Sequence, residues 1–198
     1  MSWKLVFSGV GGQGVISAGI ALAEAAVIHE GRYAVQSQSY GAEMRGGLSR
    51  ADVTISSSEV IYPKVDQAHV LVCLHRKALR AYTSVIRPGG LLITDRDEAP
   101  VTGRIDSRQY AVPCAATARE LTGSDRNANI CMLGVLVAIT GVVSVAALEA
   151  AVQARFGSHE TVLQAFRAGY TMGSDHAAAR AFYTDSHETG RHATSARS

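Results

Sequence analysis

The sequence predicts an α/β protein with a Rossmann-like, open and mostly parallel sheet followed by a helical C-terminal part. Short apolar runs typical of buried strands alternate with helix-like segments in the first half of the chain. A glycine cluster separates the first strand from the first helix, and the segments after the last strand are helix-like. These observations favour one domain over 1–183, with a sheet core over 4–113, a helical part over 115–183 and a disordered tail over 184–198.

Periodicity and turn residues assign the elements in order. Apolar or alternating runs predict strands over 4–7, 33–37, 49–56, 69–74, 91–95 and 109–113, with a short edge strand at 60–62. Helical spacing predicts helices over 15–30, 75–86, 115–122, 129–141, 144–156 and 159–170, with a short last helix over 174–183. Gly31 and Ser144 are expected to cap helices, and the RPGG run over 87–90 to form a turn. Alternation over 49–56 indicates a half-buried strand.

Composition argues against several classes of protein. The 198 residues carry a formal net charge of +2, and no run of Lys or Arg suggests nucleic-acid binding. The longest apolar stretch, over 130–143, is shorter than the ~18 residues of a membrane span, and the N-terminus lacks a signal-peptide pattern. Cys73, Cys114 and Cys131 form no C-x-x-C pair, which predicts no metal site and reduced thiols. We therefore expect a cytoplasmic protein without nucleic acid or membrane as a partner.

The glycine cluster SGVGGQG predicts a site for an anion. Gly9, Gly11 and Gly14 satisfy G-x-G-x-x-G between a strand and a helix. Gly9 is expected to permit the tight turn, Gly11 to let a ligand approach the backbone, and Gly14 to let helix and strand pack closely. Exposed N–H groups and the helix dipole favour phosphate or carboxylate. The alternatives are that the glycines only make a turn, and that Gln13 caps the loop instead of donating to a ligand.

The same loop lacks the partner that NAD requires. NAD binding expects an acidic residue about 20 positions further on, at the end of the second strand. Here that strand ends AVQSQS, and Glu30 stands before it. No Arg follows the strand at a position suited to a 2′-phosphate. We therefore expect an anionic ligand other than NAD.

A second loop, QSYGAEMRGGL, carries three glycines and both signs of charge. In an α/β sheet, this loop and the glycine loop are expected to leave the carboxyl ends of neighbouring strands, where ligands bind. The glycines allow unusual backbone angles around Arg45, which can point into a site or into a partner protein. The alternative is a solvated turn in which Glu43 pairs with Arg45.

Other polar residues are expected to be structural. Asp95 ends a strand on the presumed ligand side and is expected to cap the following turn. Asn127 and Asn129 precede an apolar helix, which we expect them to cap and which we expect to be buried in the subunit or against a partner. The seven histidines show no spacing typical of metal ligands.

Taken together, these motifs resemble the gamma subunit, or gamma domain, of 2-oxoacid:ferredoxin oxidoreductases. The combination of G-x-G-G-Q-G with Y-G-x-E-x-R-G-G at this separation is specific, whereas either motif alone is not. SYGAEMRGG is more similar to the 2-oxoglutarate type than to the indolepyruvate type, in which a histidine often stands at the position of Tyr40. The resemblance covers residues 4–172 and continues through VIYPKVDQAHVLVCL, RPGGLLITD, NANICMLGVLVAITGVVSVAALEAAV and FRAGY.

The resemblance implies a non-catalytic subunit of an enzyme complex. Such a complex converts a 2-oxoacid, here 2-oxoglutarate, and coenzyme A to acyl-CoA and carbon dioxide, or the reverse, with electrons passed to ferredoxin. Thiamine diphosphate, Mg²⁺ and [4Fe-4S] clusters would belong to alpha and beta subunits, with a delta subunit in larger assemblies. The alternatives are gamma-type subunits of pyruvate, ketoisovalerate or indolepyruvate oxidoreductases, a stand-alone NAD(P)-binding Rossmann protein, and a self-standing binding or scaffold protein.

The glycine loop and the family resemblance both indicate coenzyme A (CoA) as the ligand, because its phosphates suit a glycine loop without an acidic partner. We expect backbone N–H groups of the loop to face the phosphates, and Arg45 to contact a phosphate or another subunit. No catalytic or metal-binding residue is assigned. The candidate ligand-binding residues are Gly9, Gly11, Gly12, Gln13, Gly14 and Arg45, and the candidate interface or site-loop residues are Ser39, Tyr40, Gly41, Glu43, Gly46 and Gly47.

Overall fold

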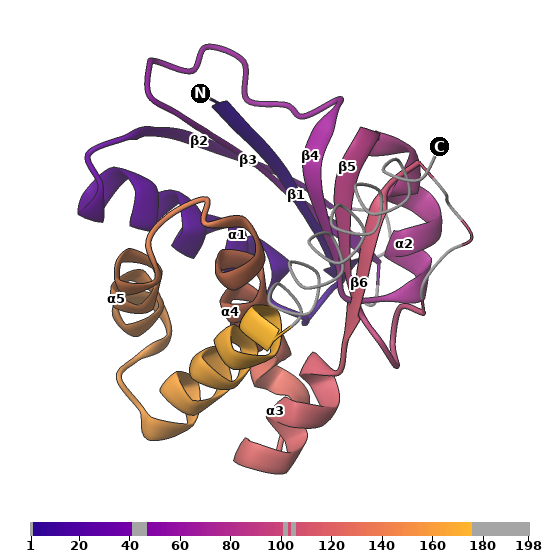
Figure 1. Ribbon diagram of the computed structural model, residues 1–198, viewed down its shortest axis with the longest axis vertical. Coiled ribbons are helices and arrows are strands. Elements are labelled where there is room, and N and C mark those ends of the chain that lie inside the picture. The colour runs from indigo at the N-terminus through magenta and orange to yellow at the C-terminus, as the bar shows by residue number, and fades with distance from the viewer. Residues whose placement is uncertain (1, 41–46, 101–102, 104–105, 176–198) are drawn as a thin grey trace, which may run out of the picture.

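The computed structural model describes residues 2–40, 47–100, 103 and 106–175, and it confirms the α/β class. A six-stranded sheet has the order β2-β3-β1-β4-β5-β6 (Figure 1). The strands are β1 (Ser2–Val10), β2 (Tyr33–Tyr40), β3 (Leu48–Ser56), β4 (Ala68–Cys73), β5 (Ile86–Asp95) and β6 (Arg108–Val112). β3 pairs antiparallel with both β1 and β2, whereas β1, β4, β5 and β6 pair in parallel. The sheet is therefore mostly parallel, with β3 reversed.

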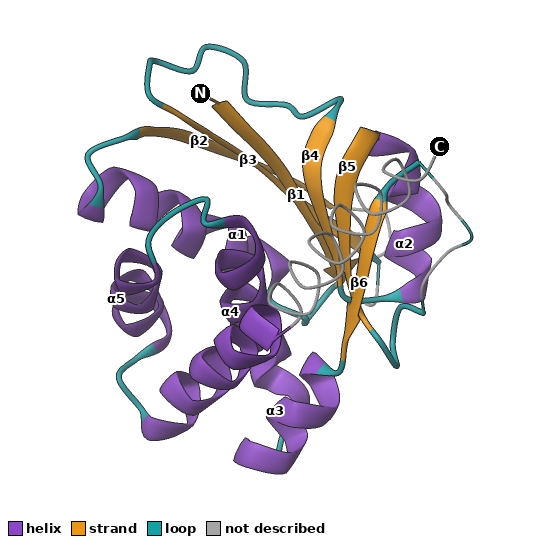
Figure 2. Ribbon diagram, in the orientation of Figure 1, coloured by secondary structure: helices purple, strands orange, loops and turns teal. Residues whose placement is uncertain are grey.

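The helices form two unequal layers on the sheet (Figure 2). They are α1 (Val15–Glu24) with a π-helical turn (Ala25–His29), α2 (Arg76–Tyr82), α3 (Cys114–Thr122), α4 (Ala128–Thr140), α5 (Val145–Phe156) and a last helix over 160–175, with 3-10 turns at Thr83–Val85 and Asp125–Asn127. α1, α4, α5 and the last helix cover one face, and α2 covers the other. None of the helices in the described ranges has the length and hydropathy needed to cross a bilayer.

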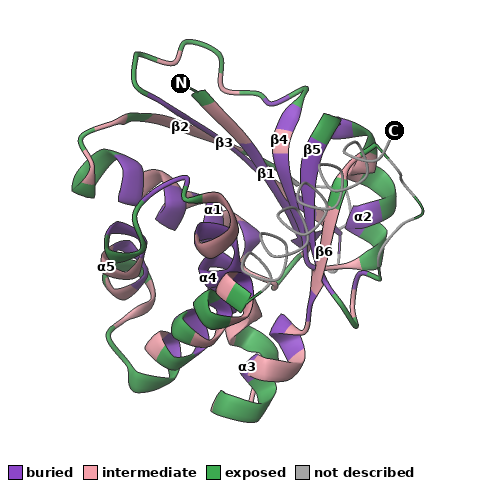
Figure 3. Cartoon of the chain, in the orientation of Figure 1, coloured by how far each residue is buried: buried purple, intermediate pink, exposed green. Residues whose placement is uncertain are grey.

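The central strands are largely buried (Figure 3), and alternation of their side chains divides the core between these layers. Leu5 and Phe7 of β1 pack with α1, α4 and α5, whereas Val6 between them packs with α2 and the chain before β4. All three side chains are buried. Burying one such side chain stabilises the fold by roughly 1.5–3 kcal/mol, so both faces contribute to stability.

α4 is the central helix of the larger layer, as its all-round apolar sequence predicts. Every residue over 129–137 is buried. A Cβ at Gly134 would overlap the carbonyl oxygen of Phe166, and a Cβ at Gly169 would overlap the carbonyl oxygen of Cys131. α4 and the last helix therefore cross in backbone contact, which only glycine permits.

Two expectations about strands are wrong. Residues 60–62 form no strand, because side chains hold the surrounding loop: Val65 N–H donates to Asp52 Oδ2 (2.9 Å) and Ser37 Oγ donates to the carbonyl oxygen of Pro63 (3.1 Å). The RPGG run over 87–90 lies inside β5, where pairing with β4 shifts register. It is a bulge, since Gly89 with φ 70° takes a conformation that suits glycine.

β3 was expected to bury one face but buries both. Asp52, Thr54 and Ser56 are buried on the face away from α1. Asp52 is satisfied there, because it also accepts from Arg50 Nε (2.5 Å) and Nη2 (3.0 Å). Alternation of polar and apolar residues predicts that the polar face of a strand contacts solvent. In β3 the ion pair between Arg50 and Asp52 satisfies the buried charge, so this face can be buried.

The expected helix caps are confirmed where the structure describes them. Ser144 Oγ accepts from Ala147 N–H (3.3 Å), and Gly31 has a φ of 63° after the first helix. The predicted helix over 174–183 is described only to residue 175, as the end of the last helix. Its remainder and the predicted tail over 184–198 lie outside the described residues.

Candidate functional site

The glycine loop connects β1 to α1 at the carboxyl end of the parallel strands. Gly12 and Gly14 have φ angles of 94° and 67°, in the left-handed region, so they make the turn. Gly9 lies within β1, where a Cβ would stand 2.6 Å from Gln13 Oε1. Gly9 is therefore needed to make room for the Gln13 side chain and not, as expected, for the turn itself.

Gln13 closes the loop with both ends of its side chain. Its Oε1 accepts from Val10 N–H (2.9 Å), and its Nε2 donates to the carbonyl oxygen of Leu74 (3.0 Å). Leu74 directly follows β4, the parallel neighbour of β1. Of the two roles considered for Gln13, the structure shows loop capping, and the cap joins the ends of β1 and β4.

The two glycine motifs are joined by a backbone hydrogen bond. Gly11 N–H donates to the carbonyl oxygen of Gly47 (2.9 Å), so this N–H is occupied within the chain. The loops were expected to leave neighbouring strands, which is wrong because β3 lies between β1 and β2. They meet because β3 begins beside the end of β1, with Val10 opposite Leu48.

Half of the second loop lies outside the described residues. Gly41, Glu43, Arg45 and Gly46 belong to that part, and their predicted roles stay predictions. Ser39 is exposed near the end of β2, and Tyr40 is the last residue of that strand.

Asn129 joins the start of α4 to the glycine loop. Its Nδ2 donates to the carbonyl oxygen of Gly14 (3.2 Å), and a Cβ at Gly14 would overlap it. Asn129 lies inside α4, and Asn127 occupies the cap position without a side-chain hydrogen bond, so neither caps the helix as expected. Gly14 thus permits close packing against α4 and not against a strand. Within the described chain, Asn129 Oδ1 is buried without a hydrogen-bond partner.

A cavity of about 190 Å³ opens beside this junction. Its walls come from the glycine loop (Gly12 and Gln13), the end of β4 (Leu74) and the first residues of α3 and α4 (Ala115 and Ala128). It therefore lies at the point where the chain turns from β1 to one side of the sheet and from β4 to the other. Open α/β sheets bind ligands at such a crevice.

Charged side chains of both signs line the cavity. Arg126 lines it from the 3-10 turn before α4, together with the acidic residues Glu98 and Asp125. Asp125 is paired with Arg119 (3.0 Å). Arg126 was not among the residues predicted from the sequence, although its place just before a helix N-terminus is a signal for anion binding.

Asp95 caps the turn that follows β5, as expected, and it also fixes the positions of Glu98 and Ala115 in two walls of the cavity. Its Oδ1 accepts from the N–H groups of Asp97 and Glu98 (both 3.1 Å), and its Oδ2 accepts from Ala115 N–H (2.7 Å). Beside it, burial, the Cys131 thiol and the Asp95 carboxylate raise the pKa of the Cys114 thiol well above its usual value. Cys114 is therefore a neutral thiol at pH 7 and not an activated nucleophile.

Comparisons with known proteins point in one direction. The family model described as pyruvate ferredoxin/flavodoxin oxidoreductase matches residues 4–172. The 2-oxoglutarate synthase subunit KorC of Methanothermobacter thermautotrophicus is 45% identical over 174 residues, which cover 84% of this chain and 92% of that protein.

Two solved structures are similar over most of the chain. The gamma subunit of a keto/oxoacid ferredoxin oxidoreductase from Geobacter sulfurreducens PCA superposes with a TM-score of 0.74 at 39% identity, covering 89% of this chain and 99% of that one. A 2-oxoglutarate:ferredoxin oxidoreductase from Magnetococcus marinus, solved with 2-oxoglutarate, coenzyme A and succinyl-CoA bound, has a TM-score of 0.78 at 25% identity. That match covers 88% of this chain and 31% of the larger chain.

Proposed function

This chain belongs to the pyruvate ferredoxin/flavodoxin oxidoreductase family as a gamma-type subunit, and we propose that its complex oxidises 2-oxoglutarate with coenzyme A. The family predicted from the motifs is thereby confirmed. The names of the relative at 45% identity and of the CoA-bound structure support 2-oxoglutarate as the substrate. Gamma-type subunits that act on pyruvate, ketoisovalerate or indolepyruvate are the alternatives within the family.

The proposed reaction joins the acyl group of a 2-oxoacid to CoA, releases carbon dioxide and passes electrons to ferredoxin, or runs in reverse. When bound, thiamine diphosphate, Mg²⁺ and [4Fe-4S] clusters supply the decarboxylation and electron transfer, and we assign them to alpha and beta partner subunits. Within the described ranges, no three His, Cys, Asp or Glu side chains are grouped to hold a metal ion. We therefore assign no step of electron transfer to this chain. The buried free thiols of Cys73, Cys114 and Cys131 support a cytoplasmic complex.

We place the phosphates of CoA at the cavity beside the glycine loop. The observation that supports this site is that Arg126 and the N-termini of α1 and α4 converge there. Helix N-termini present backbone N–H groups and a positive partial charge, and Gly12 exposes its backbone without a side chain. Asp125 opposes an anion less because Arg119 neutralises it. In this arrangement the chain binds and orients CoA and does not react with it.

The same geometry disfavours a stand-alone NAD(P)-binding protein. β3 separates β2 from β1, which puts the end of β2 two strand spacings, about 10 Å, from the glycine loop. A carboxylate there would not reach the ribose of a dinucleotide bound at the loop. Glu30 is occupied elsewhere, because it accepts from Ser144 N–H (2.6 Å) and pairs with Arg32 (3.3 Å).

The proposal is tested with Arg126→Ala in a complex co-purified with its alpha and beta subunits. Because hydrogen bonds to a charged group contribute about 1.5–3 kcal/mol, we expect the KM for CoA to rise by roughly 10-fold or more. The KM for 2-oxoglutarate should stay unchanged. The matched control is Arg167→Ala, which removes an exposed arginine paired with Glu149 (2.6 Å) on the outer side of the helical layer.

Two results would count against the proposal. An assembled Arg126→Ala complex with an unchanged KM for CoA would show that CoA does not bind in this cavity. If thiamine-containing and cluster-containing subunits did not co-purify with the chain, the proposal that it is a subunit of such a complex would be contradicted. Assays with pyruvate, branched-chain 2-oxoacids and indolepyruvate distinguish the alternatives within the family. Arg45→Ala, tested in parallel, examines the residue predicted from the second loop.

A further inference from the structure

A second and larger cavity lies at the opposite end of the sheet, where the parallel strands begin. Its volume is about 370 Å³, within the range of small-molecule sites. Its walls come from the starts of β1, β4, β5 and β6 and from the C-terminal end of α4. α4 has 13 residues, so about 20 Å of helix separates this cavity from the glycine loop. The proposed CoA site does not account for it.

Two unpaired arginines line this cavity. Among the described residues, neither the Arg87 nor the Arg108 side chain has a hydrogen bond or an ion pair, and no carboxylate lines the cavity with them. Arg32, Arg50 and Arg155, by contrast, each bind a carboxylate. Two guanidinium groups at one cavity repel each other, and an anion between them would remove that repulsion and accept hydrogen bonds from both.

The bulge in β5 places Arg87 at the cavity. Between the pairs Ala68–Ile86 and Val70–Leu91, β5 has three more residues than β4, so the register of the pairing shifts there. Gly89 turns the bulge with its φ of 70°, and its N–H donates to the carbonyl oxygen of Asp106 (2.6 Å). A bulge re-aims side chains and is common next to binding sites.

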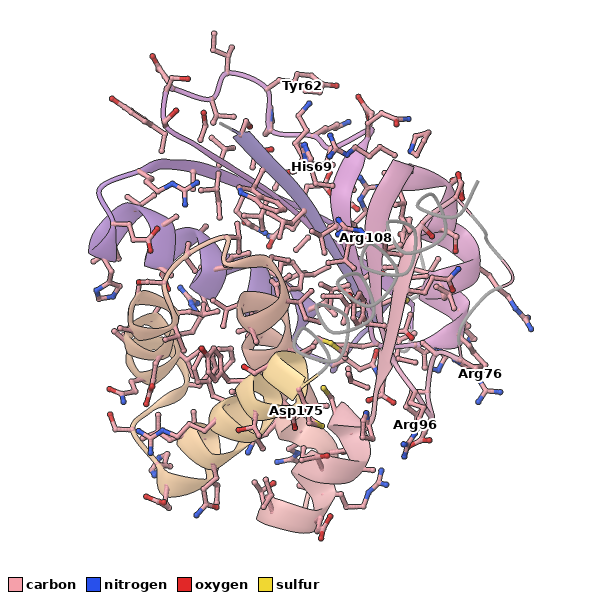
Figure 4. All side chains as sticks on the ribbon, viewed as in Figure 1. Tyr62, His69, Arg76, Arg96, Arg108 and Asp175 are labelled. Atoms are coloured by element: carbon pink, nitrogen blue, oxygen red, sulfur yellow. The ribbon has the colours of Figure 1, made fainter. Side chains whose placement is uncertain are left out.

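An aromatic pair forms another wall of the cavity. His69 Nδ1 accepts from Lys4 N–H (2.9 Å), so the Nε2 atom carries the ring proton and is a donor. Burial, Arg87 and Lys4 all lower the pKa of His69, which keeps the ring neutral at pH 7. Trp3 lies beside it, with ring centroids 5.9 Å apart. Figure 4 labels His69 and Arg108 in the upper part of the sheet, at the end opposite Arg76 and Arg96.

The remaining wall is the end of α4. Ile139 adds apolar surface and Thr140 adds a polar residue. The last carbonyl groups of a helix have no N–H partner within it, which makes this end of α4 a source of hydrogen-bond acceptors. Carbonyl groups accept from amino groups and disfavour anions. The cavity thus has cations at one wall, flat apolar surface at another and hydrogen-bond acceptors at a third.

We propose that this cavity binds a nucleoside phosphate, with the phosphate between Arg87 and Arg108 and an amino-substituted base against Trp3. Phosphate matches two guanidinium forks, and the base matches the indole and the carbonyl-bearing end of α4. The same chemistry is present in a free adenine nucleotide and in the nucleotide end of CoA. The site is independent of the CoA site proposed at the glycine loop.

The test uses Trp3 as the reporter, because it is the only tryptophan of the chain. AMP, adenosine, inorganic phosphate and CoA are each titrated into the purified full chain while tryptophan fluorescence is measured. We expect a saturable change with AMP, at least about 10-fold weaker binding of adenosine and of phosphate, and a similar loss for AMP in the Arg87→Ala/Arg108→Ala variant. The control is Arg96→Ala, an exposed arginine at the other end of the sheet.

Thermal unfolding gives an independent readout. AMP should raise the Tm of the wild-type chain and of Arg96→Ala but not that of the double variant. A response to CoA that the double variant loses, with little response to AMP, identifies the bound nucleotide as that of CoA, whereas the reverse identifies a free nucleotide; a response to CoA that the double variant keeps comes from the glycine-loop site. No saturable response to either, or an undiminished response in the double variant, overturns the proposal. Equal affinity for phosphate and AMP overturns the role of Trp3.

Discussion

The two ends of the sheet differ in how their polar groups are satisfied. At the carboxyl end, Gln13 uses both ends of its side chain, Asp95 accepts from three N–H groups and Gly11 donates to Gly47. At the amino end, Arg87 and Arg108 have no partner among the described residues. At the carboxyl end, Gln13 and Asp95 are already bonded within the chain, so replacing either should damage the fold. The amino end is built from side chains, where substitution should mainly affect binding.

The largest effect is expected where α4, which connects the two ends, crosses the last helix. Gly169→Ala forces a methyl group into the carbonyl oxygen of Cys131, and neither backbone can move without separating the helices. We expect a loss of more than about 3 kcal/mol of unfolding free energy, measured by urea denaturation. Gly103→Ala is the control, because a Cβ there has no atom within 4 Å. Equal stability of the two variants would mean that the helices do not cross in backbone contact.

The next effect concerns the carboxyl end alone. Asp95 is fully buried, so Asp95→Ala leaves three backbone N–H groups without their acceptor. We expect a loss of roughly 3 kcal/mol, since each unsatisfied buried group costs about 1–3 kcal/mol and water partly replaces the carboxylate. Asp97→Ala removes a half-exposed carboxylate two residues away and should change stability by less than about 0.5 kcal/mol. Comparable losses would contradict the difference drawn between these side chains.

The smallest effect is a pH dependence at the amino end. The folded chain holds the pKa of His69 below its usual value, so the unfolded chain takes up this proton first as the pH falls below about 6.5. Stability is therefore lost on acidification through this range, by less than about 1 kcal/mol for a partly exposed ring. His69→Gln should show a flatter profile between pH 7.5 and 5, because glutamine does not titrate. Parallel profiles for the two proteins would show that His69 is not perturbed.

Local sequence features predicted most of the fold because they act over a few residues. Apolar runs located the strands, and Ser144 and Gly31 marked helix ends through hydrogen bonds and backbone angles that involve their own neighbours. Two errors came from the same reasoning. The alternation over 49–56 was taken for a solvated face, and the glycines at 87–90 for a turn, but the surrounding chain covers the first and pairs the second.

The candidate site was predictable only in part. The glycine loop is recognisable from its spacing, and Asp95 from its place at the end of a strand. Arg126 and Asn129 approach that loop only because α4 packs across α1, which no local pattern reports. The predicted roles of Gly9 and Gly14 were wrong because each glycine makes room for a side chain, that of Gln13 beside Gly9 and that of Asn129 beside Gly14.

By itself, the sequence determined the class of the protein, its family and the position of the glycine loop, because composition, spacing and motifs are properties of the chain alone. Only the tertiary structure decided that β3 separates β1 from β2, that the two glycine motifs share a hydrogen bond and that Arg87 and Arg108 line one cavity with Trp3 at the far end. Strand order and the meeting of distant side chains depend on how whole layers pack. Packing is settled by the total buried surface and by satisfied polar groups, and not by any single segment.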